Sequence, residues 1–373
     1  LEMAPIFLKK DALELRDFIK KFIKYGDSKN TMYRIDNGKI KPSKNLADSL
    51  ASMIKGNEEF TMIDEQKIVY ENAIFLANKS TALNKNVLII EGGPGTGKTV
   101  VAINLLVQLT KLGKVTKYVT KNAAPRTVYE SKLTGTIKKT EISNLFTGSG
   151  AFTSQDHNSF DSLIVDEAHR LNEKSGMFQN LGENQVKEII QAAKFSIFFI
   201  DEDQKVTFKD IGTKEEIKKW ARSCNAHVHN LELSSQFRCN GSDGYLAWLD
   251  NTLDIRETAN FSLNEIDYDF KVVDTPNELR DIIFEKNKLN NKARLVAGYC
   301  WNWASKKNPD AMDIIIPEHN FAMQWNLGSY GNLWILDENS VNEIGCIHTC
   351  QGLELDYVGV IIGNDFIIRN GQV

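Results

Sequence analysis

The 373-residue sequence lacks any apolar run that approaches the roughly 18 residues expected of a membrane-spanning helix. Its N-terminus also lacks the pattern of a secretory signal peptide. There is no excess of one charge, because 45 Lys and Arg residues stand against 49 Asp and Glu, giving a net charge of -4. A uniformly basic coat is therefore excluded, and any binding to phosphate backbones must come from a local patch. We expect a soluble, cytoplasmic protein.

Cysteine is scarce, with five residues that are far apart except for the last pair. An odd number at such spacing does not resemble a disulfide framework, so we expect reduced thiols. The pattern Cys346-x-His348-x-Cys350 suggests a metal ligand set, but structural zinc needs four ligands and no second Cys/His pair accompanies it. The sequence therefore gives little support for zinc.

The first 60 residues have a helical pattern and no chemical motif. Apolar residues recur at helical spacing over 11–25 and again over 46–54. Between these runs, Asn37-Gly38 is a tight-turn signal. Residues 1–60 are therefore predicted to form a helical accessory segment.

After residue 60 the pattern changes to short apolar strands that alternate with helices. The first series predicts a helix over 98–111 and strands at 87–91, 115–120, 162–165, 195–200 and 227–233. A second series predicts strands at 270–273, 294–297, 313–316 and 357–362. Apolar strands separated by helices are typical of parallel sheets covered on both faces, so the predicted fold class is α/β.

A phosphate-binding motif follows the first predicted strand. Residues 92–99 read GGPGTGKT, a complete G-x-x-x-x-G-K-[ST] between a strand and a helix. Backbone amides of such a loop point at phosphates, while Lys98 would reach the β and γ phosphates and the Thr99 hydroxyl would ligate Mg²⁺. The alternative is a glycine-rich turn without a ligand. The predicted nucleotide-binding residues are Gly92, Gly93, Pro94, Gly95, Thr96, Gly97, Lys98, Thr99 and Val100.

An acidic pair ends the predicted strand at 162–165. Asp166 is the candidate partner of the metal, and Glu167 is placed to polarise the attacking water. The same pair could instead be a charge cluster at a helix N-terminus. Beside a complete phosphate loop, the catalytic interpretation is favoured.

Further segments resemble motifs of superfamily 1 helicases, and they occur in the same order along the chain. Residues 201–204, Asp-Glu-Asp-Gln, resemble the Gly-Asp-x-x-Gln motif, with Ile200 in place of the glycine. Residues 235–238, Ser-Gln-Phe-Arg, resemble Asn-Tyr-Arg, and residues 348–354, HTCQGLE, resemble the motif with Lys-Gly-Leu-Glu. Gln66 lies upstream of the phosphate loop, where that superfamily keeps its adenine-reading glutamine.

The chain is similar to the Schlafen group III helicase-like family and its bacterial relatives, roughly from residue 60 to the end. The family pattern is found in residues 121–126, 235–249, 298–301 and 323–326. The resemblance implies that Gln204 senses the γ-phosphate, that Arg238 contacts it from the edge of the first domain, and that Glu354 binds the ribose.

The resemblance also implies two RecA-like domains, at residues 61–240 and 241–373, with ATP and Mg²⁺ in their cleft. The family's late arginine-bearing motif does not follow Glu354. We therefore expect a second domain that is incomplete at its C-terminus, and slow hydrolysis by this chain. Some relatives carry a nuclease-like domain, so an attached nuclease or a protein partner outside this chain is a further candidate.

A basic stretch lies between the two predicted ATP motifs. Residues 101–150 contain eight Lys and Arg residues against two Glu, a local balance of +6 in a net acidic chain. In superfamily 1 enzymes the loop after the second strand contacts the backbone of a single-stranded nucleic acid. The segment that corresponds to this loop contains Lys121, Asn122 and Arg126. The alternative is a solvated basic face. Trp301 is a candidate for base stacking, although such residues more often fill a core.

These patterns predict an ATP-dependent nucleic-acid motor, a helicase or translocase acting on DNA or RNA, that hydrolyses ATP with Mg²⁺. The predicted catalytic residues are Lys98, Glu167, Gln204 and Arg238. The alternative is a regulatory ATPase switch that controls a protein partner or an attached nuclease without processive unwinding. A small-molecule kinase would share the phosphate loop but does not explain the three helicase-like segments together.

Overall fold

The structure is a computed structural model, and the chain in it divides into two units, Leu1–Pro42 and Ser43–Val373. It describes residues 12–22, 50, 53, 62, 64–135, 138–176, 178–205, 207–234, 243–263, 268–326, 331–350 and 353–370. In the first unit, helix α1 (Ala12–Phe22) confirms the helical pattern over 11–25. The second predicted helix, over 46–54, lies outside the described residues except for Leu50 and Met53.

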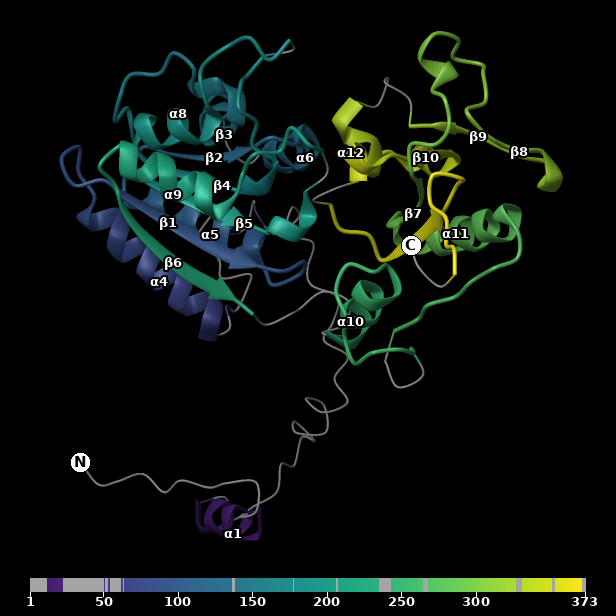
Figure 1. Ribbon diagram of the computed structural model, residues 1–373, viewed down its shortest axis with the longest axis horizontal. Coiled ribbons are helices and arrows are strands. Elements are labelled where there is room, and N and C mark those ends of the chain that lie inside the picture. The colour runs from purple at the N-terminus through teal and green to yellow at the C-terminus, as the bar shows by residue number, and fades with distance from the viewer. Residues whose placement is uncertain are drawn as a thin grey trace. The chain divides into compact units, whose positions relative to one another are not determined.

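A six-stranded sheet forms the first half of the second unit (Figure 1). Its order is β3-β2-β4-β5-β1-β6, and every neighbouring pair is parallel. The strands are β1 (Asn86–Gly92), β2 (Thr116–Thr120), β3 (Phe146–Gly148), β4 (Phe160–Val165), β5 (Ala193–Ile200) and β6 (His227–Leu233). Because β5 lies between β1 and β4, the ends of β1 and β4 are separated by one strand.

Helices bury both faces of this sheet. Along β1, Leu88 and Ile90 point to one face and Val87 and Ile89 to the other, and all four are buried. The first face packs against α4 (Asp64–Lys79), α5 (Lys98–Lys111) and α6 (Ala123–Leu133). The opposite face packs against α8 (Gln185–Ala192) and α9 (Lys214–Ser223). A sixth helix, α7 (Lys139–Leu145), precedes β3.

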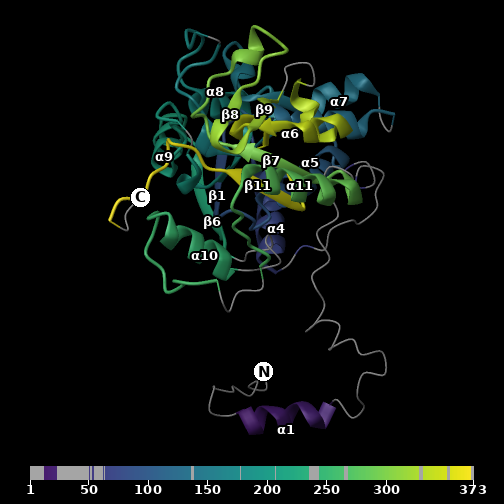
Figure 2. The ribbon, with the colours of Figure 1, turned by 90° about the vertical axis from the view of Figure 1, so that its right-hand side faces the viewer.

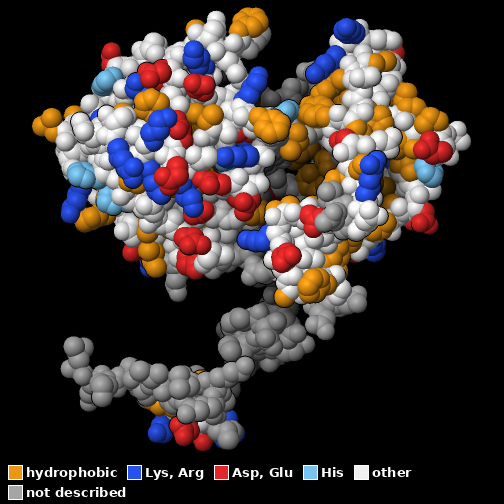
Figure 3. All heavy atoms as spheres, viewed as in Figure 1, with side chains coloured by type: hydrophobic (Ala, Val, Ile, Leu, Met, Phe, Trp, Pro, Cys, Tyr) orange, Lys and Arg blue, Asp and Glu red, His pale blue; other side chains and the backbone are white. Residues whose placement is uncertain are grey.

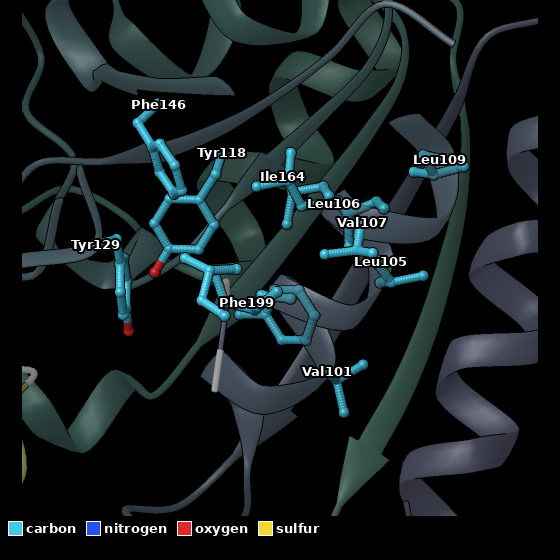
Figure 4. Close-up of a cluster of buried hydrophobic side chains, with 14 of the residues drawn as sticks. Val101, Leu105, Leu106, Val107, Leu109, Tyr118, Tyr129, Phe146, Ile164 and Phe199 are labelled. Atoms are coloured by element: carbon cyan, nitrogen blue, oxygen red, sulfur yellow. The ribbon is translucent and has the colours of Figure 1, made fainter. Parts of the chain in front are cut away.

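Aromatic rings fill the core beside the end of β2. Tyr118 meets Tyr129 of α6 edge-on at 6.1 Å and Phe146 of β3 at 5.7 Å. Figure 4 shows these rings on one side of Ile164 and Phe199, with the α5 side chains Val101 and Leu105 on the other. The hydroxyl of Tyr118 lies at the edge of this cluster, where the strand ends.

A second sheet of five strands forms the other half of the unit, in the order β11-β7-β10-β9-β8. Its strands are β7 (Ala293–Ala297), β8 (Ile314–Ile316), β9 (Phe321–Trp325), β10 (Glu343–Gly345) and β11 (Tyr357–Ile361). All pairs are parallel except β8 with β9, which are antiparallel. The helices are α10 (Asp243–Thr252), α11 (Pro276–Asn290), which runs alongside β7 and β11 (Figure 2), and the short α12 (Ile347–Cys350).

A buried arginine joins the second sheet to the segment that precedes β10. Arg294 of β7 is fully buried, and its Nη2 donates to the carbonyls of Ile335 (3.1 Å) and Asp337 (3.0 Å). Burial lowers the pKa of Arg294 to about 10. Ile335 and its neighbour Trp334 pack in the same core as α6, so this segment connects the two sheets.

The predicted α/β class is confirmed, as are most predicted strands and the helix over 98–111. The strand expected at 270–273 is wrong. Those residues form no strand, and Val272 is 86% exposed, because no neighbouring strand covers this short apolar run. Strands β3, β9 and β10 were not predicted, and two of them have only three residues. No helix within the described ranges is long and apolar enough to cross a membrane.

Candidate nucleotide-binding site

The phosphate loop follows β1 and leads directly into α5. Gly95 and Gly97 have φ angles of 80° and 84°, a left-handed conformation that favours glycine. A Cβ atom added at Gly97 would lie 2.2 Å from Gln66 Nε2, and one at Gly92 would lie 2.6 Å from Thr96 Oγ1. Gly97 is therefore required by both backbone conformation and close packing, Gly95 by its backbone conformation and Gly92 by close packing.

Lys98 is the first residue of α5, and its ammonium folds back over the loop. Its Nζ donates to the carbonyls of Gly92 (2.6 Å) and Gly93 (2.8 Å), and it lies 3.6 Å from Asp201 Oδ2. The side chain is only 7% exposed. A buried ammonium held mainly by carbonyls is well suited to turn toward an anion, which is the group that this loop should bind.

Asp201 is a site residue to which the sequence assigned no role. It follows β5, the strand between β1 and β4, and burial raises the pKa of its carboxyl. Its Oδ2 has no hydrogen-bond partner among the described residues. The signal was present in the motif at 201–204, whose first residue it is, but the carboxylate's position beside Lys98 follows only from the strand order.

Thr99 and Asp166 lie together, as the prediction of a metal site requires. The Thr99 hydroxyl donates to Asp166 Oδ2 at 2.8 Å, and the Tyr118 hydroxyl donates to the same oxygen at 2.6 Å. Burial, together with the neighbouring charge of Glu167, raises the pKa of Asp166. A divalent cation would favour the charged carboxylate, and these oxygen groups are the type that Mg²⁺ prefers.

Glu167 has a left-handed backbone (φ 53°), which is uncommon for a residue with a side chain. Its Oε2 lies 3.0 Å from His169 Nε2. The other ring nitrogen, Nδ1, accepts a hydrogen bond from the Asp201 backbone N–H at 3.3 Å. An imidazole that accepts at Nδ1 carries its proton on Nε2. That nitrogen lies within ion-pair distance of Glu167 but is not aligned for a hydrogen bond to it.

Gln66 reaches the phosphate loop from α4. It is buried, and its Nε2 donates to the carbonyl of Thr96 at 3.1 Å. The preceding Glu65 accepts hydrogen bonds from the backbone N–H (3.1 Å) and hydroxyl (2.7 Å) of Ser234, which follows β6. The structure thus brings Gln66 to the site, while its reading of adenine stays a prediction.

The remaining predicted ATP residues are less clearly defined. Gln204 is half-buried in a short turn (η4, Glu202–Gln204) after β5, and its backbone N–H donates to the Asp201 carbonyl at 3.2 Å. Glu354 is half-buried between α12 and β11. Arg238 lies outside the described residues. The roles given to these three residues stay predictions.

The loop after β2 is tied into the fold. Lys121 Nζ donates to Asn172 Oδ1 and Asp210 Oδ1, both at 2.8 Å, and burial lowers its pKa. Asn122 caps α6 by accepting from the Ala124 N–H at 3.2 Å. Arg126 Nε lies 4.0 Å from Glu130. The first two residues therefore have structural roles beside the nucleic-acid contact predicted for them.

Asp210 connects three loops at the carboxyl edge of the first sheet. Its buried carboxylate accepts from Lys121, from Arg170 Nε at 3.0 Å and from the Thr207 N–H at 2.9 Å. Nearby, a Cβ atom added at Gly212 would lie 1.8 Å from the Ala168 carbonyl oxygen. The loop after β5 therefore packs directly on the segment that carries Glu167.

The predicted stacking residue, Trp301, is half-buried and packs against the core of the second sheet. Another aromatic residue, which the sequence analysis did not select, is fully exposed. Phe208 projects from the loop after β5, between Lys205 and Lys209. The exposure of a side chain cannot be predicted from one sequence. The presence of Phe208 between Lys205 and Lys209, directly after the 201–204 motif, could have indicated a nucleic-acid contact.

The sequence is similar to a known protein family and to a yeast protein. The profile described as the Schlafen group 3 DNA/RNA helicase domain matches residues 85–373. An uncharacterized protein of Saccharomyces cerevisiae, YPL245W, is 22% identical over 320 residues, which is 76% of this chain and 70% of the yeast protein.

Among solved structures, a DNA replication initiation factor is 14% identical, with a TM-score of 0.29, over 63% of this chain and 64% of that chain. The replication initiator DnaA bound to AMPPCP and single-stranded DNA is 16% identical, with a TM-score of 0.28, over 62% of this chain and 63% of that chain. The matched region spans less than two thirds of either solved chain.

Proposed function

Because the chain belongs to the Schlafen group 3 DNA/RNA helicase domain family, we propose that it is an ATP-dependent nucleic-acid motor. The family membership confirms the resemblance that the sequence motifs indicated. The proposed activity is that of a superfamily 1-like helicase or translocase that hydrolyses ATP with Mg²⁺. We also propose that the two sheets belong to two RecA-like domains, residues 61–240 and 241–373.

The observation that carries this proposal is the hydrogen bond between Asp166 and Thr99, the residue that follows Lys98 in the phosphate loop. It joins the two residues that would hold Mg²⁺ to a loop shaped for phosphates. When bound, Mg²⁺ would neutralise charge on the phosphate oxygens. Lys98 would leave its carbonyl partners and bind the β and γ phosphates, and Glu167 would orient and polarise the attacking water.

The nucleic-acid part of the proposal rests on the loops that adjoin this site. Phe208 offers an exposed ring for base stacking, and Lys205 and Lys209 offer charges for the phosphates on either side. The same loop contacts the Glu167 segment through Gly212 and is held by Asp210. A strand bound at Phe208 would therefore act on the segment that positions the attacking water.

A regulatory ATPase switch is the second candidate. The observation in its favour is that the Lys121 ammonium donates to Asp210 and Asn172. One residue predicted to contact a nucleic-acid backbone is therefore already paired within the protein. Such a switch would control a protein partner or an attached nuclease and would not need a strand. The two functions differ in whether single strands accelerate hydrolysis.

The test is phosphate release from ATP and Mg²⁺ with and without a single-stranded oligothymidylate. We expect the oligonucleotide to raise the rate. Phe208→Ala should raise the oligonucleotide concentration needed for half the effect by about 5-fold or more, as expected for loss of one stacked base. Phe178→Ala is the matched control, because Phe178 is 82% exposed on a neighbouring loop.

An unchanged rate with both oligothymidylate and oligouridylate would contradict the motor and favour the switch. Equal responses of the Phe208→Ala and Phe178→Ala variants would leave the motor in place but would move the strand away from Phe208.

A further inference from the structure

An aromatic cluster lies at the carboxyl edge of the second sheet, away from the phosphate loop. Tyr299 follows β7, Trp325 ends β9, and His348 lies in α12 after β10. The Tyr299 ring centre is 5.6 Å from that of Trp325 and 5.8 Å from that of His348. Trp303 is 6.1 Å from Tyr299 and 5.8 Å from Trp325. Three strands thus bring four rings together.

Tyr299 and His348 are the exposed members of this cluster. Tyr299 is 48% exposed, whereas Trp325 is fully buried and Trp303 is half-buried. Burial, together with the nearby Cys346 side chain, raises the pKa of Tyr299. The half-exposed Tyr299 ring packs beside the buried indole of Trp325, at a tilt of 45°.

Positive charge lies on the same loop. Lys306 Nζ lies 3.9 Å from the ring centre of Trp303, and the next residue, Lys307, is exposed. An ammonium over an indole is a favourable contact that also keeps the cation beside the aromatic surface. The loop 299–307 therefore combines an exposed ring with two lysines, which is the chemistry of a single strand's bases and phosphates.

The cluster also adjoins the basic loop of the first sheet. Burial lowers the pKa of His348, and the positive charges of Arg170 and Lys121 lower it further. Helix α12, which carries His348, also contacts α6, whose cap is Asn122. Helix α12 therefore contacts α6 and also carries His348, whose ring lies beside that of Tyr299.

We propose that the loop 299–307 is a base-stacking platform for single-stranded nucleic acid, with Tyr299 as the residue on which a base stacks and Lys306 and Lys307 beside the phosphates. This replaces Trp301, which packs into the core, as the stacking residue of the second sheet. The inference rests on the proposed function, because it names where a strand lies on the second sheet.

The test is binding of the full chain to a fluorescein-labelled oligothymidylate of about 20 nucleotides, measured by anisotropy. Tyr299→Leu keeps the apolar bulk but removes the aromatic face, and it should raise Kd about 5- to 100-fold, the range for one or more lost stacks. Tyr299→Phe should bind close to the parent. Phe270→Leu is the matched control, because Phe270 is an exposed aromatic residue (42%) in a different ring cluster.

Two further measurements separate stacking from loss of the fold. On an abasic phosphodiester of the same length, the parent and Tyr299→Leu should bind equally, because no base is left to stack. The salt dependence of Kd should be unchanged by Tyr299→Leu and flattened by replacing Lys306 and Lys307 with Gln. Weaker binding of Tyr299→Leu to the abasic strand as well would show a damaged fold and overturn the platform.

The outcomes distinguish this inference from the proposed function. If the parent binds oligothymidylate and Tyr299→Leu binds it equally well, the platform is wrong while the motor can stand. If the parent binds neither oligothymidylate nor oligouridylate, both the platform and the nucleic-acid part of the proposed function are wrong.

Discussion

The two sheets of the second unit contain similar strands but differ in how completely they are covered. In β1, every residue except Glu91 is buried, and helices pack on both faces. In β11, Gly359 and Ile361 are buried toward α11, whereas Val358 and Val360 are 50% and 57% exposed. Figure 3 shows the same contrast at the surface, with hydrophobic side chains gathered over the half that carries the second sheet.

The difference in burial matches a difference in the functions proposed for the two sheets. The groups that would bind phosphates and metal come from the ends of β1, β4 and β5, where hydrogen bonds and one ion pair hold them close together. The second sheet instead presents rings and lysines on a loop at its edge. We therefore expect substitutions at the edge of the first sheet to lower stability or turnover. Substitutions on the open face of the second sheet should change stability little.

The largest effect on stability should come from Asp210→Ala. It removes the buried carboxylate that serves Lys121 and Arg170, and loss of one partner of a buried pair costs about 3 to 5 kcal/mol. Urea unfolding would measure this loss. Asp281→Ala is the matched control, because Asp281 is exposed and pairs with the adjacent Arg280, so its loss should cost less than about 1 kcal/mol. Equal losses would show that the Asp210 cluster does not hold the loops.

A smaller effect, on turnover, is expected for His169→Leu. Without the imidazole that lies 3.0 Å from Glu167, we expect the carboxylate to lose its orientation, so kcat should fall about 10- to 100-fold with little change in KM for ATP. His169→Gln can donate to Glu167 and accept from Asp201, so it should recover most of the loss. If kcat of His169→Gln were no higher than kcat of His169→Leu, His169 would act only by filling space in the core.

The smallest effect is expected for Val360→Thr on the open face of β11. The substitution keeps the β-branched shape of an exposed strand residue, so the free energy of unfolding should change by less than about 0.5 kcal/mol. Thermal unfolding of the variant beside the parent would measure it. A loss above about 2 kcal/mol would mean that this face is covered in solution, and the comparison between the two sheets would fail.

The sequence predicted the long, buried strands better than the short ones. Long apolar strands such as β1 and β5, and the helix after the phosphate loop, have an evident period and were predicted to within a few residues. Strands of three residues, such as β10, carry too few positions to show a period. The false strand at 270–273 has the right residues, but no partner strand pairs with it.

The candidate site shows a similar limit. Motif spacing identified Lys98, Thr99, Asp166 and Glu167, because local sequence determines a strand that ends at a loop. Asp201 required the strand order, since β5 brings its carboxylate to Lys98 from about a hundred residues away in sequence. The engagement of Lys121 by Asp210 likewise depends on long-range packing that no local pattern reveals.

The central claim is that the carboxyl edge of the first sheet hydrolyses ATP, and it is tested most directly by phosphate release from the parent beside Lys98→Ala and Glu167→Gln. The parent should release phosphate in the presence of Mg²⁺. Lys98→Ala should abolish release, because the β and γ phosphates lose their neutralising ammonium. Glu167→Gln should still bind ATP, as measured with a fluorescent analogue, but should not turn it over. Phosphate release by Lys98→Ala at the parental rate would contradict the account.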